Sequence, residues 1–411
     1  MNKKSKNISI DYFLLGGLAI IFWDAVFNKT SGGNTSIIIV LSIILPFIPS
    51  VFKKGILSDY IHAWKFTIPL ITLCIYYAIH PSLFQTIVTD HEGRGGRIAL
   101  YILMCLISYL AGCAIVALGG VRKKTRLLIL LLALCAAVWT FDFNQSSAYG
   151  FALTKNTVIG VIFHAIFLSY FSSIPSSPIV TVERLRRKTT FLYITLPYLL
   201  AFLSAFMLGQ RSLAGGAAVA LIVCLFAFKI NYKFLFSFIT LSGAILLGIL
   251  FIYMVSNFNN FSGISEINEL FIEFSGRRAN SGRELLWSQT LYFLEKNQVF
   301  GLGVALIPPN IIETTLTSVH NSFLQVAAQV GLVGLVILIA QVAIITFIIS
   351  TAKSNIVYAF GISYIVVVIF HASFEAFLSS SNFPIASIVW MNMGVLVKLS
   401  LKRDGSHENQ R

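Results

Sequence analysis

The chain is dominated by long apolar runs that recur from end to end and are separated by mostly short polar connections. A membrane-spanning helix needs about 20 mainly apolar residues, because its backbone polar groups must be bonded within the helix. Charged residues make up only 11% of the chain, whereas a soluble domain carries roughly 25%. The runs therefore predict an all-α polytopic membrane protein.

The apolar runs predict about twelve transmembrane helices. They are centred on residues 10–27, 36–52, 66–80, 98–119, 127–141, 157–174, 190–208, 212–230, 235–255, 331–350, 356–371 and 384–400. The first run has no small-residue cleavage site behind it, so we expect it to stay as a helix. The chain then divides into spans one to nine (1–255), one large loop (256–330), spans ten to twelve (331–400) and a tail (401–411).

Basic residues are distributed unevenly between the two sides of the predicted membrane. The net charge of +14 would suit a nucleic-acid partner, but Lys and Arg of membrane proteins collect in cytoplasmic loops. With the amino terminus inside, most of the 30 basic residues fall on inner segments. We therefore expect cytoplasmic termini, a lipid environment and no nucleic-acid partner.

Several arginines contradict this pattern, because they fall on the expected outer face: Arg94, Arg97, Arg211, Arg277, Arg278 and Arg283. Arg211 lies in "LGQRSLAGG", at a short turn between two spans, and the glycines after it would let backbone approach a ligand closely. One interpretation is an arginine that snorkels to lipid headgroups. The other is an anion site, because the fork of guanidinium donors matches phosphate oxygens.

The large loop at 256–330 contains a segment with helical spacing, "GRELLWSQTLYFLEKN". Its expected face consists of Leu285, Leu286, Gln289, Leu291, Phe293 and Leu294. The segment is too short and polar to span the bilayer, so it predicts an amphipathic helix at the outer interface. Several loop arginines beside such a helix would suit the pyrophosphate of a lipid carrier. Contact with lipid headgroups, or pairing with Glu273 and Glu284, is the simpler alternative.

The stretch "SVHNSFLQVAAQVG" places His320 and Asn321 where the large loop returns to the membrane. A neutral imidazole can accept a proton from a sugar hydroxyl, which makes His320 a candidate general base and Asn321 its candidate support. The remaining histidines have no companion motif and are interpreted as structural or interfacial: His62, His80, His91, His164, His371 and His407. The five cysteines lie in apolar runs and are expected to be buried hydrophobes.

Motifs for nucleotide or metal chemistry are missing from the sequence. It contains no Walker loop, Rossmann glycine fingerprint, HExxH or GxSxG, and the predicted inner loops are too short for a nucleotide-binding domain. We therefore expect no cofactor and no metal ligands.

The sequences "LGQRSLAGG", "SGRELLW", "VFGLGVA" and "SVHNSFLQVAAQVGLVGLV" follow one another along the chain. With this pattern the chain resembles the O-antigen ligase and polymerase superfamily of bacterial envelopes. The number of spans, the single large outer loop and the length are most similar to the O-antigen ligase, a multispan, GT-C-like glycosyltransferase. The resemblance implies that Arg211 and Arg283 hold a pyrophosphate and that His320 is catalytic. Arg278 is the second choice in the loop, and Arg277 is a supporting candidate.

The resemblance also implies an activity. The ligase family transfers finished polysaccharide from undecaprenyl pyrophosphate to lipid A–core, at the periplasmic face of the inner membrane and without metal. The polymerase of the same superfamily is the nearest alternative, because only its acceptor differs. A transporter or flippase is the third, and its expected mark would be ionisable residues within the membrane, for which Asp24 and Glu375 are candidates.

Overall fold

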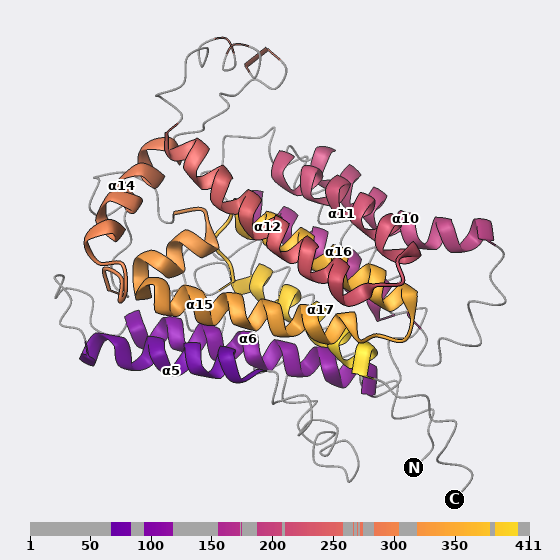
Figure 1. Cartoon of the computed structure of the whole chain (residues 1–411), viewed down its shortest axis with the longest axis horizontal. Coiled ribbons are helices and arrows are strands. Elements are labelled where there is room, and N and C mark those ends of the chain that lie inside the picture. Colours follow the sequence, from indigo (N-terminus) through magenta and orange to yellow (C-terminus); the bar gives the residue numbers. More distant parts are fainter. Residues whose placement is uncertain are drawn as a thin grey trace, which may run out of the picture.

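A computed structural model of the chain describes residues 67–83, 94–117, 155–172, 174, 187–207, 210–257, 266, 269, 272–273, 283–303, 319–378 and 383–401. Within these ranges, the elements of the fold are all α-helices (Figure 1), which confirms the predicted fold class for this part of the chain. The predicted spans 10–27, 36–52 and 127–141 lie outside the described residues. Every other predicted span overlaps a helix.

The helices are α5 (Ile68–Leu83), α6 (Arg94–Ala117), α8 (Lys155–Phe171), α10 (Arg187–Met207), α11 (Arg211–Lys229), α12 (Lys233–Ser256), α14 (Arg283–Lys296), α15 (Ser322–Ser350), α16 (Asn355–Ala372) and α17 (Phe383–Leu401). Among the described residues, α11, α12, α15, α16 and most of α17 are long and apolar enough to cross a membrane.

Helices α16 and α17 lie at the centre of the bundle (Figure 1), where nearly all of their described side chains are buried. Helix α17 packs on α6 and α8, and α16 packs on α11 and α12. The α6–α17 contact is close because it is made by glycines. A Cβ on Gly112 would lie 2.0 Å from the Met391 carbonyl oxygen, and one on Gly394 would lie 2.0 Å from that of Tyr109. Small residues at such crossings are typical of membrane helices, which associate largely through van der Waals packing.

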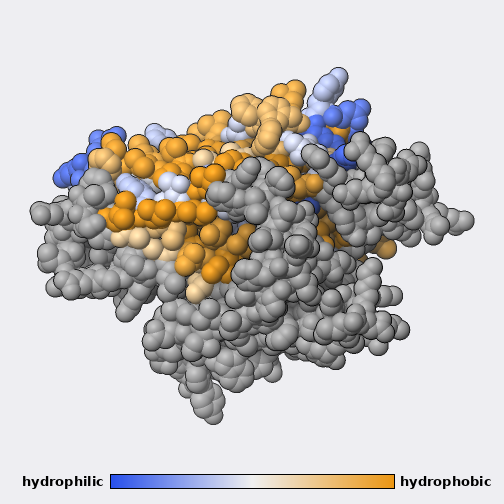
Figure 2. Space-filling view, turned by 90° about the horizontal axis from the view of Figure 1, so that it is seen from below, coloured by the Kyte–Doolittle hydropathy of each residue, from blue (hydrophilic) through white to orange (hydrophobic). Residues whose placement is uncertain are grey.

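Helix α12 lies at the outside of the bundle and exposes large apolar side chains along its length, among them Phe238, Leu247 and Tyr253. Figure 2 shows a hydrophobic band across the described surface, with hydrophilic residues gathered at its two ends. An exposed apolar face of this extent is stable only against lipid or another apolar surface. The pattern therefore agrees with a helix layer that spans a membrane.

Helix α15 begins at Ser322 rather than at the predicted 331, and it is broken in its first half. Val330 and Gly331 leave the helical conformation, with φ of −129° and 70°. The segment 298–303 fills the break: Leu302 N–H donates to the Ala328 carbonyl at 2.7 Å, and Leu332 N–H donates to that of Gln298 at 2.8 Å. The backbone groups released by the break are therefore bonded to protein, as apolar surroundings require.

Candidate active site

The turn before α15 orients His320. Asn321 caps the helix, because its Oδ1 accepts from the Leu324 N–H at 2.9 Å, and its Nδ2 donates to the Ser373 carbonyl at 3.0 Å. Asn321 is fully buried, whereas His320 keeps part of its side chain exposed. His320 has a φ of 52°, in the left-handed region that side chains rarely adopt. This backbone turn, together with the cap, presents the imidazole at the edge of the helix layer.

Ser322 attaches the segment that follows α16 to the start of α15. Its hydroxyl donates to the Glu375 carbonyl at 2.8 Å and accepts from the N–H groups of Phe377 and Leu378 at 2.9 and 3.2 Å. With the Asn321–Ser373 bond, these contacts fix the backbone of 373–378 beside His320. They determine where the carboxyl group of Glu375 lies.

Glu375 lies beside His320: the imidazole Nδ1 is 3.4 Å from Oε1. Burial on its own would raise the pKa of the Glu375 carboxyl. The hydrogen bond and charge of His320, with His371 and Arg283 nearby, outweigh burial and bring this pKa below its ordinary value. The carboxylate is therefore ionised at neutral pH, and it favours a proton on Nδ1 of His320.

Arg283, at the start of α14, completes the cluster. Its guanidinium donates to the Phe374 carbonyl at 3.3 Å and lies 5.7 Å from the centre of the Phe374 ring. Burial lowers the pKa of Arg283, and the Glu375 carboxylate opposes that shift. The side chain stays charged, because a guanidinium in a protein does not lose its proton. Histidine, carboxylate and guanidinium thus meet at one place.

Helix α14 is held against this site through Trp287. The indole Nε1–H donates to the Val319 carbonyl at 2.8 Å, next to His320 in the chain, and Leu286, Trp287, Val319 and Leu324 form one apolar cluster. Phe251 of α12 packs on it, with ring centroids 5.8 Å from Trp287 and 4.7 Å from Phe374. Arg283 is therefore carried on a packed helix rather than on a free loop.

The predicted loop helix is confirmed as α14, but its predicted apolar face is partly wrong. The fully buried side chains are Leu286, Trp287 and Thr290, whereas Leu285 is 52% exposed. Trp287 takes the buried position because it combines the largest apolar surface with a donor that finds a partner inside. The position of α14 at an outer interface stays a prediction.

Arg211 is the first residue of α11, and its side chain is exposed. One turn further, Gly215 and Gly216 pack on the ring of Phe370, near the end of α16 that leads to Glu375. Arg211 therefore lies at the same end of the helix layer as the His320 cluster. Gly215 and Gly216 thus serve helix packing, and the expectation that the glycines admit a ligand stays a prediction. Arg277 and Arg278 lie outside the described residues.

Glu375 is the residue of this site that sequence reasoning missed as a catalytic partner. It follows an apolar span and belongs to no motif, and its only signal was its acidic character near a span end. A carboxylate in that position is interpreted first as a charge within the membrane. Its contact with His320 cannot be predicted, because the two residues are far apart in the sequence. The long-range bonds of Asn321 and Ser322 create this pairing.

An apolar groove lies beside the cluster, between α12, α14, α15 and α16. Its volume is about 220 Å³, and its lining includes Ile245, Ile249, Ile252, Phe323, Ala327 and Leu335. Ser373, whose carbonyl accepts from Asn321, and Leu324, which Asn321 caps, also line it. The groove therefore extends from the polar cluster along the apolar faces of helices that can span a membrane.

Part of the chain matches a known protein family. A family model described as O-antigen ligase matches residues 196–339, a range that contains Arg211, Arg283 and His320. A comparison with curated proteins found no match. The matched range ends before Glu375, so the carboxylate of the cluster comes from a part of the chain beyond it.

Proposed function

We propose that the chain, whose residues 196–339 match a family model described as O-antigen ligase, is a glycosyltransferase that moves polysaccharide from undecaprenyl pyrophosphate to lipid A–core. We further propose that the transfer occurs at the periplasmic face of the bacterial inner membrane, with both termini cytoplasmic. The observation that carries the proposal is the cluster of His320, Glu375 and Arg283 at the start of α15.

His320 is the general base of the proposed reaction. Because its Nδ1 faces the Glu375 carboxylate at 3.4 Å, Nδ1 carries the proton and Nε2 keeps the lone pair. Nε2 takes the proton of the acceptor hydroxyl as the oxygen attacks the anomeric carbon of the donor sugar. The imidazolium that results is stabilised by Glu375, whose charge is already present at neutral pH.

The leaving group is the lipid pyrophosphate. As the bond between the anomeric carbon and the phosphate oxygen breaks, its electron pair stays on that oxygen, and the configuration of the sugar inverts. Arg283 offsets the growing charge, and Arg211 contributes from the start of α11. The first turn of α15 adds the partial positive charge of a helix amino terminus. These groups are suited to the reaction without a metal ion.

The groove and the exposed face of α12 support a lipid-linked donor. A polyprenyl chain is entirely apolar and would lie in a groove that is lined almost wholly by aliphatic side chains. Its pyrophosphate would then lie near Ser373, which precedes Phe374, the residue whose carbonyl accepts from Arg283.

The polymerase of the same superfamily remains the alternative enzyme, because it would use the same base and cations with a different acceptor. The break in α15 does not support a transporter, because segment 298–303 already forms hydrogen bonds with the backbone groups that the break exposes. Ionisable Glu375 pairs with His320 rather than standing alone in the membrane.

The test is reconstitution of the purified protein in lipid vesicles with undecaprenyl-pyrophosphate-linked polysaccharide and lipid A–core. We expect polysaccharide on lipid A–core, also in excess chelator, and no product with the His320→Ala variant. Longer carrier-linked chains without capped lipid A–core would identify a polymerase instead. Movement of the donor across the bilayer without any transfer would identify a transporter and refute the proposal.

A further inference from the structure

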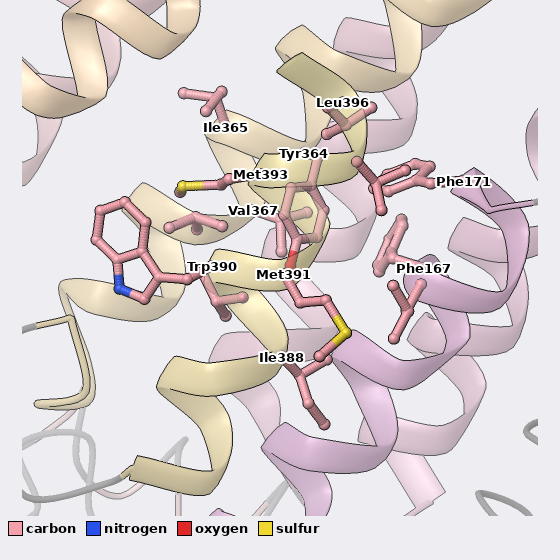
Figure 3. Packing of buried hydrophobic residues seen from close by; sticks show 14 of the residues in the cluster. Phe167, Phe171, Tyr364, Ile365, Val367, Ile388, Trp390, Met391, Met393 and Leu396 are labelled. Carbon is pink, nitrogen blue, oxygen red and sulfur yellow. The ribbon is translucent and has the colours of Figure 1, made fainter. Parts of the chain in front are cut away.

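A chain of buried polar side chains ends beside Glu375. His164 of α8, Tyr364 and His371 of α16, and Asn392 of α17 are each at most 3% exposed. His164 Nε2 lies 3.0 Å from His371 Nδ1, His164 Nδ1 lies 3.0 Å from the Tyr364 hydroxyl, and Asn392 Nδ2 lies 2.9 Å from the same hydroxyl. Figure 3 shows Tyr364 between the helix that carries Trp390 and Met391 and the helix that carries Phe167 and Phe171.

Asn392 fixes the direction of this chain at one end. Its Nδ2 also donates to the backbone carbonyl of His164 at 2.9 Å. A carbonyl only accepts, so the atom that faces it must be the amide nitrogen and not the oxygen. The same NH₂ group therefore donates its second proton to the Tyr364 hydroxyl oxygen.

The remaining protons then have only one arrangement. Among the described residues, the only acceptor in reach of the Tyr364 hydroxyl proton is Nδ1 of His164. His164 is then protonated on Nε2, which donates to Nδ1 of His371. Because Nδ1 of neutral His371 accepts, its own proton must be on Nε2.

His371 is one turn before Glu375. The Glu375 N–H donates to the His371 carbonyl at 2.9 Å, and the His371 ring packs on Phe377 with centroids 4.6 Å apart. Among the described residues, the ionisable groups that face Glu375 are His320 from the start of α15, Arg283 from α14 and His371 from α16. His371 is the one of the three that is buried inside the bundle.

We propose that His371 is a positioning residue for the reaction: the hydrogen-bond chain from Asn392 through Tyr364 and His164 holds it as the neutral Nε2–H tautomer. The Glu375 carboxylate then interacts with His320 and Arg283 and not with a charged His371. The inference rests on the proposed function, because the role given to the hydrogen-bond chain is to keep the transferred proton on His320.

The hydrogen-bond chain opposes protonation of His371 because of the contact between Tyr364 and Asn392 at its other end. A proton on Nδ1 of His371 would have to donate to His164 Nε2, so His164 would carry its proton on Nδ1 and donate to Tyr364. The Tyr364 oxygen would then accept from both His164 and Asn392, and its own proton would be left buried without an acceptor. A buried polar group without a partner is unfavourable, so the arrangement resists reversal.

The first measurement is ¹⁵N solid-state NMR of histidine-labelled wild-type protein in lipid. We expect His371 and His164 to be neutral Nε2–H tautomers at neutral pH. A charged His371, or one protonated on Nδ1, would overturn the inference. This measurement needs no variant and no transfer activity, so it stays informative if the proposed function fails.

The second measurement compares Tyr364→Phe with Tyr198→Phe. Both side chains are fully buried tyrosines that pack on Phe167, and Tyr198 bonds to Ser363 rather than to a histidine. In Tyr364→Phe we expect kcat to fall about 3- to 10-fold, the scale of one hydrogen bond, with the KM for the donor unchanged. We also expect the acid limb of the kcat/KM profile to move to higher pH, because His371 can then be protonated and compete for Glu375.

The control variant should keep the wild-type pH profile. If Tyr364→Phe and Tyr198→Phe have the same profile and the same kcat, the chain has only a structural role and the inference is wrong. Failure of the wild-type protein to transfer polysaccharide to any acceptor would instead refute the proposed function, and the tautomer measurement would then decide this inference alone.

Discussion

The Nδ1 atom of His320 and the Oε1 atom of Glu375 lie 3.4 Å apart, although the two residues belong to different segments that flank α15 and α16. Two further bonds hold these segments together, from Asn321 to the Ser373 carbonyl and from Ser322 to that of Glu375. The histidine–carboxylate pair is therefore built into the fold. It decides which nitrogen of the imidazole is available to a substrate.

Glu375→Gln should lower kcat by up to about 10⁴-fold, the scale of the loss when the carboxylate that orients a general-base histidine is replaced by an amide. The amide keeps the shape of the side chain but cannot stabilise an imidazolium. The measurement is transfer rate and membrane abundance on the same preparations, with Glu295→Gln, at an exposed position of α14, as the control. Equal rates for both variants would remove Glu375 from the mechanism.

His320→Gln and His320→Ala should both lose transfer by about 10²- to 10⁴-fold, because an amide cannot act as a proton acceptor. Binding of the lipid-linked donor should persist, since Arg211 and Arg283 remain. Donor binding and transfer are to be compared at equal protein abundance. Substantial transfer by the glutamine variant would contradict the role as a base.

Arg283→Lys should fail almost as badly as Arg283→Ala, with a loss in kcat of about 100-fold, the scale of one transition-state donor. Lysine keeps a charge but loses the planar fork that reaches the Phe374 carbonyl and lies over its ring. Arg211→Lys is the companion measurement. Full activity of the Arg211 variant would favour contact with lipid headgroups over a role at the pyrophosphate.

Gly331→Ala should destabilise the protein by about 1–3 kcal/mol and lower its abundance, because a positive φ disfavours a side chain. The added Cβ would also lie 2.1 Å from the Val299 carbonyl oxygen. Gly243→Ala in α12 is the control, because its Cβ would meet nothing within 4 Å. Thermal unfolding in detergent measures both. Equal midpoints would show that segment 298–303 is not fixed in the break.

The pH dependence of the stability should reflect the ionisation of the Glu375 carboxyl group. Its pKa is lowered in the folded protein, so the ionised form contributes stability that is fully present above the ordinary carboxyl value of 4.5. This contribution is lost as the pH falls through the lower, folded-state pKa. Unfolding midpoints of wild type and Glu375→Gln should therefore differ at pH 7 and converge below pH 4.5. A constant difference across that range would contradict the assignment.

Much of the helix layer could be predicted from the sequence, because a membrane span requires a continuous apolar run and such runs are visible without tertiary contacts. The start of α15 could not be predicted in this way. Gly331 looks like a boundary in sequence, whereas in the fold it is the point where backbone from 298–303 enters the helix. A break that is satisfied by a distant segment has no local signal.

The candidate site was predicted in part. The resemblance implied that Arg283 and His320 act at one site, and the structure brings both of them near Glu375. Glu375 and His371 were not predicted as members of the site, because their roles depend on contacts between residues far apart in the chain. His371 had been interpreted as structural for the same reason.

The φ of 52° at His320 has a consequence for any attempt to make this protein more robust. A non-glycine residue in this conformation carries strain of about 1 kcal/mol or more, which glycine would relieve. Stability and activity are thus in opposition at a single position. A selection for thermostability that does not measure transfer would favour replacing this histidine, and it would yield a more stable protein that lacks the proposed base.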